Sequence, residues 1–270
     1  MWKLWGAVAV AVSLTSVTPR AQQVKSYDDL LDSYVRGGLV YYRALKAERS
    51  KLDSYVNQLG NANVDGMPRD EQIAFWLNAY NALVLKTVVD HYPIAGHSAA
   101  YPQKSIRQIP GAFDKTTHHV GGKTMTLDQI EQTILPSFKD PRVYFALGRG
   151  AEGGGRLRSE MFTATKLAAQ LEEVEKECAS RHQCVQFDRD ANKVTASPIF
   201  SWREKEFVDG FADKASSQFS NRSPIERAVL GFVGPSLLTT EKEALDANTF
   251  QVAFGQFDWR LNDLTGRGGR

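Results

Sequence analysis

Apolar residues recur at helical spacing in several separated stretches of this sequence. The strongest stretch covers residues 69–91, where apolar side chains surround the helix axis almost completely. We therefore expect a helix that is buried on most sides and that ends before Pro93, because the residue before a proline resists helical backbone angles. Shorter amphipathic patterns predict helices over residues 28–36 and 48–59, with a glycine pair interrupting the chain between them.

Patterns typical of strands are short and are joined by turns. Residues 118–125 and 184–197 each contain a turn between two extended pieces, which predicts two hairpins. Residues 142–147 form a compact apolar run suited to a strand, and residues 250–257 alternate as a final strand. Further helices are predicted over residues 126–135, 159–178, 225–232 and 241–247. The predicted fold class is α+β: a helix-rich single domain with a small mixed or antiparallel sheet and β-hairpins.

The composition is that of an ordinary globular protein. Of the 270 residues, 42% are hydrophobic and 24% are charged, and the formal net charge is only +2. No block of lysine and arginine of the kind that binds nucleic acid is found, so nucleic acid is not expected as a partner. Any attraction to anions must therefore be a local property of one site.

The N-terminal residues are typical of an export signal. Lys3 precedes the apolar stretch 4–14, after which the chain turns polar, and this predicts a signal peptide over residues 1–23. The apolar stretch is shorter than the roughly 20 residues that span a bilayer. No stable transmembrane segment is expected after processing, with an uncleaved membrane anchor as the alternative. We expect a periplasmic or extracellular protein with one domain over residues 24–263 and a disordered tail over residues 264–270.

Export changes the interpretation of the two cysteines. Cys178 and Cys184 are separated by five residues at the end of a predicted helix, and a disulfide that closes this turn is the preferred prediction. Zinc is not expected, because only His182 lies close by and structural zinc sites use four nitrogen or sulfur ligands. No metal and no cofactor are predicted.

The most informative segment is the loop over residues 145–160, in which an apolar run ends in five glycines and three arginines. Glycine permits positive φ and a concave row of N–H groups, and arginine donates two parallel hydrogen bonds to a carboxylate or phosphate. We expect an anion-binding site, delivered by the strand over 142–147 and completed by the N-terminus of the helix from residue 159. The alternative is a tight loop whose arginines pair with acids of the protein itself. The loop residues expected to contact a ligand are Arg149, Gly150, Gly153, Gly154, Arg156 and Arg158.

Two asparagine side chains on the buried helix form a second group of candidate residues. Asn78 and Asn81 lie three residues apart on the buried helix, so their side chains are neighbours. Buried amides need hydrogen-bond partners. The two side chains are expected either to hold the backbone of a neighbouring loop or to contact the ligand.

Histidine supplies the candidate general bases, because its ordinary pKa lies nearest neutrality. His118 and His119 lie beside the first predicted hairpin turn, and His91 ends the buried helix, where it can satisfy terminal carbonyls. A structural role is the alternative for each of them.

Aromatic residues are frequent near the end of the chain. Such residues usually fill a hydrophobic interior, so Phe200, Trp202, Phe257 and Trp259 are expected in the core. Residues 203–206 are expected to form a solvated face.

Six successive motifs resemble a known family. They are Ala74-Phe-Trp-Leu-Asn-Ala-Tyr-Asn-Ala82, His91-Tyr-Pro93, Leu127-Asp-Gln-Ile-Glu131, Asp140-Pro-Arg142, Ile199-Phe-Ser-Trp202 and Phe257-Asp-Trp-Arg-Leu-Asn262. In order and spacing they are similar to the domain-of-unknown-function 547 family, from about Tyr27 to Asn262. The resemblance implies a shared fold and an exported bacterial protein, and it assigns no activity.

The glycine- and arginine-rich loop departs from the pattern of many members of that family. Where they carry two cysteines followed by a proline, this sequence has Arg149, Gly154 and Gly155, and Tyr144 stands where a histidine is often found. Thiol chemistry is therefore not carried over to this chain. We interpret it as a subfamily with a different pocket chemistry.

Two classes of function follow. The first is an exported binding module for a small anionic ligand, a peptide terminus or an envelope polymer. The alternative is a cysteine-less hydrolase with a layout resembling thiol peptidases, in which His119 and Glu131 are catalytic; Glu131 enters through its position in the resembling motifs. Binding is preferred, and whether the chain is an enzyme stays open, because a hydrolytic assignment needs nucleophile, base and orienting group in measured geometry.

Overall fold

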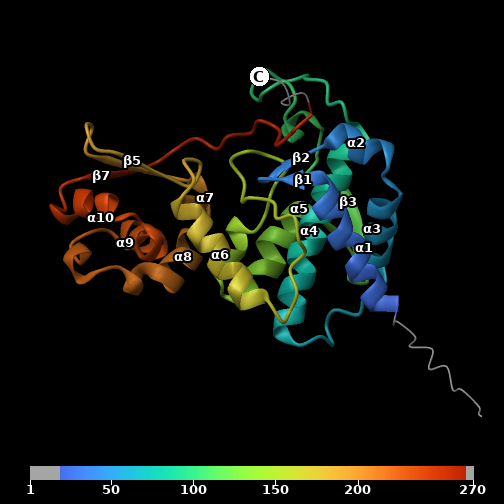
Figure 1. The fold of residues 1–270 in the computed structure, drawn as a ribbon, viewed down its shortest axis with the longest axis horizontal. Helices are drawn as coiled ribbons and strands as arrows, with labels where there is room; N and C mark the ends of the chain where they lie inside the picture. Colours follow the sequence, from blue (N-terminus) through green and yellow to red (C-terminus); the bar gives the residue numbers. More distant parts are fainter. Residues whose placement is uncertain (1–18, 266–270) are drawn as a thin grey trace, which may run out of the picture.

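Helix α4 (Arg69–His91) is the longest helix in the computed structural model, which describes residues 19–265 (Figure 1). Its bounds are those expected from the sequence, and 15 of its 23 residues are buried. An apolar pattern on all sides of the axis explains this burial. Most of the predicted signal peptide (residues 1–23) and of the predicted tail (residues 264–270) lies outside the described residues. Within residues 19–265, no helix is both long and apolar enough to cross a membrane.

Among residues 19–265, three helices precede α4. They are α1 (Pro19–Tyr34), α2 (Tyr42–Ala47) and α3 (Ser50–Gly60). Helices α2 and α3 contact α4 directly, and α1 packs on α3, where the rings of Tyr27 and Tyr55 stack with centroids 4.0 Å apart. The helix expected over residues 28–36 ends at Tyr34, because the chain turns there into a short ribbon of β1 (Val35–Arg36) and β2 (Leu39–Val40).

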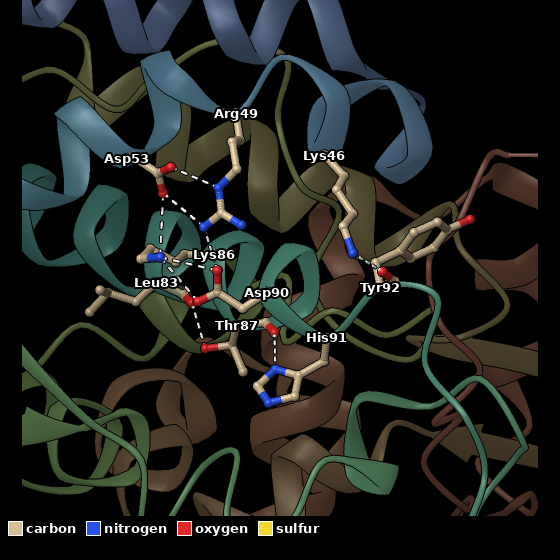
Figure 2. A network of polar contacts seen from close by, with 9 residues as sticks. All are labelled: Lys46, Arg49, Asp53, Leu83, Lys86, Thr87, Asp90, His91 and Tyr92. Atoms are coloured by element: carbon tan, nitrogen blue, oxygen red, sulfur yellow. Dashed lines mark hydrogen bonds and ion pairs between the residues drawn. The ribbon is translucent and has the colours of Figure 1, made fainter.

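Ion pairs outside the core connect α3 to α4 (Figure 2). Arg49, at the start of α3, pairs with Asp53 at 2.7 Å and also with Asp90 of α4. Lys86 of α4 pairs with the same two acids, at 3.3 Å from Asp53 and 3.0 Å from Asp90. The two carboxylates are therefore neutralised inside this network.

The strands form small sheets. The hairpin of β3 (Thr117–Val120) and β4 (Lys123–Thr126) is antiparallel, as is the hairpin of β5 (Val185–Asp188) and β6 (Lys193–Ala196). Strand β7 (Gln251–Phe254) joins β6 in parallel. The two predicted hairpins and the final strand are confirmed, and the three-stranded sheet is mixed.

Between α4 and the second half of the fold, the chain makes short helical turns. After η1 (Ile106–Gln108) and the first hairpin come α5 (Leu127–Gln129), the π-helical turn η2 (Ile130–Ile134), η3 (Leu135–Phe138) and η4 (Pro141–Phe145). The strand expected over residues 142–147 is wrong, because η4 occupies this segment. The Asp140 side chain accepts a hydrogen bond from the N–H of Arg142 at 3.2 Å, and Pro141 fixes a helical φ, so the local sequence starts a helical turn.

The helix expected from residue 159 starts eight residues later, as α6 (Leu167–Ala179). Side chains hold the backbone before it. The Gln170 amide donates to the carbonyl of Met161 at 2.8 Å and accepts from the N–H of Thr163 at 3.0 Å. These bonds fix residues 161–163 outside a helix, so the predicted helix N-terminus is not at the glycine- and arginine-rich loop.

The second half of the fold is helical around an aromatic core. Rings of Phe145, Phe200, Phe207 and Phe232 pack with centroids 4.6 to 5.7 Å apart. The helices expected over residues 225–232 and 241–247 are confirmed, as α9 (Pro224–Val233) and α10 (Thr239–Asp246). The elements are α7 (Pro198–Trp202), α8 (Glu204–Phe211), η5 (Ala212–Lys214), η6 (Ser217–Phe219), α9 (Pro224–Val233), η7 (Gly234–Ser236) and α10 (Thr239–Asp246).

Trp202 is not in this core. Its side chain is 47% exposed and its ring lies against that of Phe257 at 5.1 Å. The next residue, Arg203, points inward instead, and its side chain is only 14% exposed. We expected Trp202 to be buried and Arg203 to be solvated, and both expectations are wrong. At the end of α7 the arginine side chain points into the protein and the tryptophan side chain is exposed.

After β7 the chain crosses from the C-terminal helices to the N-terminal part (Figure 1). It forms bridges from Leu261 to Ala151 and from Asp263 to Val40. This last segment covers the glycine- and arginine-rich loop and connects the two ends of the fold.

Candidate functional site

Arg149 lies in the glycine- and arginine-rich loop, with its guanidinium inside the protein. The backbone there has φ +49°, and the side chain is 2% exposed. Its Nη2 and Nε donate to the Glu131 carboxylate at 2.7 and 3.2 Å, and its Nη1 donates to the carbonyl of Tyr144 at 2.9 Å. The sequence left two possibilities for Arg149, contact with a ligand or pairing with an acid of the protein. In the structure Arg149 pairs with Glu131.

Glu131 is the centre of this buried network. Besides Arg149, its carboxylate accepts from the hydroxyl of Tyr80 at 3.2 Å and from Arg203 Nη2 at 3.3 Å. Burial alone would raise the pKa of Glu131, but the two arginines outweigh burial and hold the pKa below its ordinary value. Glu131 is therefore ionised at neutral pH and engaged by three side chains.

The N–H groups of the loop are bonded inside the protein. Those of Gly153, Gly154 and Gly155 donate to the carbonyls of Asp258, Ala151 and Leu147, at 2.9, 3.2 and 2.8 Å. Gly155 is required by close approach, because a Cβ there would lie 1.8 Å from a carbonyl oxygen. Gly150, at φ +62°, packs against α4. The glycines build a tightly closed loop, and the amides of residues 153–155 are not presented to a ligand.

The two buried asparagines hold the backbone of neighbouring segments. The Asn81 amide donates to the carbonyl of Ala146 at 3.0 Å and accepts from the N–H of Gly148 at 2.9 Å. In the same way, the Asn78 amide donates to the carbonyl of Phe162 at 2.8 Å and accepts from its N–H at 2.9 Å. Both side chains thus attach the loop and the segment after it to α4. This is the structural role that was one of the two expectations for these residues.

Arg156 is the arginine of the loop that keeps a largely exposed side chain. The side chain is 44% exposed and its Nη1 lies 3.1 Å from Glu177. It passes over the turn at Gly38, which has φ +87° and where a Cβ would lie 2.9 Å from Arg156 Cγ. Arg156 thus lies at the edge of a hollow of about 220 Å³ between the Gly37-Gly38 turn and the loop.

Arg181 lines the same hollow. Its guanidinium donates to the carbonyls of Gly154 and Glu152, each at 3.1 Å, and in the described part of the chain it has no carboxylate within ion-pair distance. Burial lowers the pKa of Arg181 and the neighbouring Arg156 adds to this, whereas the charges of Glu177 and Glu152 oppose it. Two guanidinium groups therefore share one hollow, and Glu152, which also lines it, pairs with Arg260 at 3.3 Å.

Arg158 is held apart from that hollow. Its Nη2 lies 3.0 Å from Glu160 and its Nη1 3.8 Å from Glu177, and its side chain is 16% exposed. Of the three loop arginines, only Arg156 lines the 220 Å³ hollow.

The histidines lie elsewhere. His91 Nδ1 lies 2.9 Å from the carbonyl of Thr87, one turn earlier in α4, as expected for a residue that satisfies a terminal carbonyl. The ring of His119 packs over Gly60. His119 is not among the hydrogen-bond or ion-pair partners of Glu131, so these two candidate catalytic residues are not brought together. Within residues 19–265, no three His, Cys, Asp or Glu side chains are grouped so that they could hold a metal ion.

The predicted disulfide is present. Cys178 and Cys184 are bonded, with their Cα atoms 5.1 Å apart, and join the end of α6 to the start of β5. Arg181 lies in the middle of this closed turn. The disulfide therefore helps to position the guanidinium that lines the hollow.

Sequence reasoning missed Arg181 and Arg203. Arg181 stands between the two cysteines, and a loop closed by a disulfide was the available signal that this side chain has a fixed position. Arg203 is the first residue of the charged run 203–206, which has the pattern of a solvated face, and nothing in that pattern indicates a bond to Glu131.

The comparisons with known proteins identify a family over part of the chain. Residues 64–177 match the family described as "Protein of unknown function, DUF547", which confirms the expected relationship over this segment. The segment contains α4, Glu131 and the loop with its three arginines. No significant match is found among curated proteins or among solved structures.

Proposed function

We propose that this relative of the DUF547 proteins is an exported binding module for a small anionic ligand, which it holds in the 220 Å³ hollow beside Arg156 and Arg181. A free anion, the terminal carboxylate of a peptide and an acidic group of an envelope polymer share the chemistry that such a site recognises. The supporting observation is the state of Arg181: a mostly buried cation whose hydrogen bonds go to two carbonyls.

A buried charge without an opposite charge is unfavourable, because the lost hydration is not replaced by an ion pair. In Arg181 the carbonyls of Gly154 and Glu152 replace part of that hydration. Glu177 and Glu152 act on Arg181 only from beyond ion-pair distance, so a bound carboxylate or phosphate would add the first direct ion pair in a site that is already partly desolvated. An anion would therefore bind more strongly here than beside an exposed arginine.

Arg156 adds the second half of the proposed site. Its stem lies beside Gly38 and its Nη1 pairs with Glu177 at 3.1 Å, so part of the side chain is already ordered before binding. Two guanidinium groups on one hollow can each donate paired hydrogen bonds to an oxyanion. They also repel each other, and an anion bound between them would reduce this repulsion.

Export is part of the proposal. The N-terminal pattern of one lysine, an apolar stretch and a polar stretch supports it. The disulfide between Cys178 and Cys184 agrees with an oxidising compartment, because disulfides persist in exported proteins and are rare in the cytosol. Cell fractionation of the full chain tests this part, and a chain that stays in the cytosol with both thiols reduced would contradict it.

Binding is preferred over the hydrolase alternative for a geometric reason. A general base must lie within hydrogen-bond reach of the group it activates. His119, the candidate base, is not a hydrogen-bond partner of Glu131, whose carboxylate is occupied by Tyr80, Arg149 and Arg203. Soaking crystals of the protein with sulfate and with succinate tests the binding proposal. We expect density in the hollow, bonded to Arg156 and Arg181. Anions found only on scattered exposed lysines would contradict the proposal.

A further inference from the structure

A second hollow lies between α2, the chain that follows α4 and the C-terminal segment. Its volume is about 290 Å³. Its floor is apolar and consists of Tyr92, Pro93, Ile94 and Leu261. Ile94 and Leu261 are 8% and 4% exposed, and the ring of Tyr92 packs on Tyr42 with centroids 5.9 Å apart. The floor is thus fixed by the core.

Three cations surround this floor. They are Arg43 and Lys46 of α2 and Lys104 of the loop before η1, and no acidic residue from the described part of the chain lines the hollow. Lys46 Nζ donates to the carbonyl of Tyr92, which places the ammonium at the edge of the hollow (Figure 2). An ammonium has three N–H donors, so two remain for a ligand.

The acids closest along the chain are already engaged. Asp53 and Asp90 belong to the network with Arg49 and Lys86, beside Lys46 in Figure 2. Glu48 accepts from the hydroxyl of Tyr34 at 2.7 Å.

Asp263 accepts from the hydroxyl of Tyr92 and from the N–H of Thr265, each at 2.8 Å. The charge of Asp263 and that of Arg43 both act on Tyr92. Among the described residues, Arg43, Lys46 and Lys104 nevertheless form no ion pair with a carboxylate.

We propose that this hollow binds a small organic acid. The ligand would carry one carboxylate on a compact apolar group, such as an aromatic ring system. An inorganic anion would leave the apolar floor uncovered, and a neutral hydrocarbon would leave the cations without a partner. An aryl carboxylate satisfies both, with its ring on Tyr92 and Leu261 and its charge beside Lys46. Pockets of this kind, mostly apolar with a few polar groups that fix orientation, are typical of small-molecule sites.

This site is separate from the hollow beside Arg156, because the two share no lining residue. Each proposal can therefore fail without the other. The probe for the second site is 2-naphthoate, with 2-naphthalenemethanol as the neutral analogue of similar shape. Binding of both to the full chain is measured by isothermal titration calorimetry at low ionic strength.

We expect 2-naphthoate to bind at least about tenfold more tightly than the alcohol, because only the acid carries the charge that the cations select. The double variant Lys46→Ala, Lys104→Ala should lower the affinity for 2-naphthoate by at least about tenfold and leave that for the alcohol unchanged. The charge-matched control is Lys123→Ala, Lys205→Ala, whose lysines lie at other exposed sites and which should bind like the wild type. Arg156→Ala should also leave this binding unchanged.

Equal affinity for the acid and the alcohol would overturn the proposal, as would an unchanged affinity in the Lys46, Lys104 variant. A loss of binding in the control variant of the same size would show only a general effect of net charge, and this too would overturn it.

Discussion

The guanidinium of Arg149 and the carboxylate of Glu131 meet side by side in the interior, with nitrogen–oxygen distances of 2.7 and 3.2 Å. This pair connects the glycine- and arginine-rich loop to η2, and Arg203 brings the end of α7 to the same carboxylate. The arginine that the sequence presents as the first ligand contact is thus an internal element of the fold. Its role in binding, if the protein binds anions at Arg156 and Arg181, is to hold the loop in place.

Removing the charge of Glu131 should destabilise the protein strongly. In Glu131→Gln, the buried Arg149 loses its only ion-pair partner among the described residues. Breaking a buried ion pair on one side typically costs about 3–5 kcal/mol. Urea unfolding followed by circular dichroism measures this, with Glu172→Gln as the exposed control, since Glu172 is 62% exposed. A cost in Glu131→Gln as small as in the control would show that the pair contributes little.

The same pair predicts a difference between two arginines. Arg149→Ala should destabilise the fold, because it leaves Glu131 buried beside a cavity. Arg156→Ala should change the free energy of unfolding by less than about 1 kcal/mol, because its ion pair with Glu177 is partly exposed. Thermal unfolding of both variants tests this contrast, and the reverse order of stability would contradict the assignment of the two side chains.

Acidification should remove the contribution of Glu131. Its pKa in the folded protein lies below the ordinary value of about 4.3, so its stabilising effect is fully present above that pH and is lost as the pH falls through the folded pKa. The difference in unfolding free energy between wild type and Glu131→Gln should be constant between pH 7 and 5 and should shrink below about pH 4. Urea titrations at each pH measure it. A difference that shrinks already between pH 7 and 5 would mean that the pKa is raised.

The asparagines of α4 should be essential for stability. In Asn81→Leu, the carbonyl of Ala146 and the N–H of Gly148 lose their partner inside the protein. Each unsatisfied buried group costs about 1–3 kcal/mol. Asn57→Leu on the exposed face of α3 is the matched control. Equal unfolding midpoints for the two variants would contradict the role of Asn81 in holding the loop.

Loss of the disulfide should affect both stability and binding. The loop that it closes has a sequence separation of six, for which chain entropy gives a stabilisation of about 2 kcal/mol. Arg181 lies inside this loop, so Cys178→Ala, Cys184→Ala should also weaken anion binding. Denaturation and phosphate titration of the double variant measure the two effects. Unchanged phosphate affinity would mean that Arg181 is positioned by its carbonyl contacts alone.

Much of the fold could be predicted from the sequence. A long apolar pattern of helical period indicates a helix, and a turn sequence between two extended pieces indicates a hairpin. Helix α4 and the two hairpins follow from local pattern. The segment 142–147 could not be predicted in this way, because a short apolar run suits a strand and a buried helical turn equally well. In this segment, Asp140 and Pro141 start a helical turn, and this determines its structure.

The candidate site was harder to predict than the fold. Arg158 has a partner close in sequence, Glu160, but the partners of the other two loop arginines come from distant segments: Glu131 lies 18 residues before Arg149, and Glu177 lies 21 residues after Arg156. The position of Arg181 beside Gly154 is likewise a tertiary contact. Sequence pattern shows which residues can bind an anion, and only the packing decides which of them already have a partner.

The most direct test of the central claim is a calorimetric titration of inorganic phosphate into wild type and Arg156→Ala, with Lys205→Ala as the charge-matched control. Lys205 is 82% exposed and does not line the hollow beside Arg156. We expect one saturable site in the wild type and the control, weakened by added salt, and an affinity at least about tenfold lower in Arg156→Ala, which corresponds to about 1.4 kcal/mol. Equal phosphate affinity in wild type and Arg156→Ala, or no saturable binding at all, would contradict an anion site between Arg156 and Arg181.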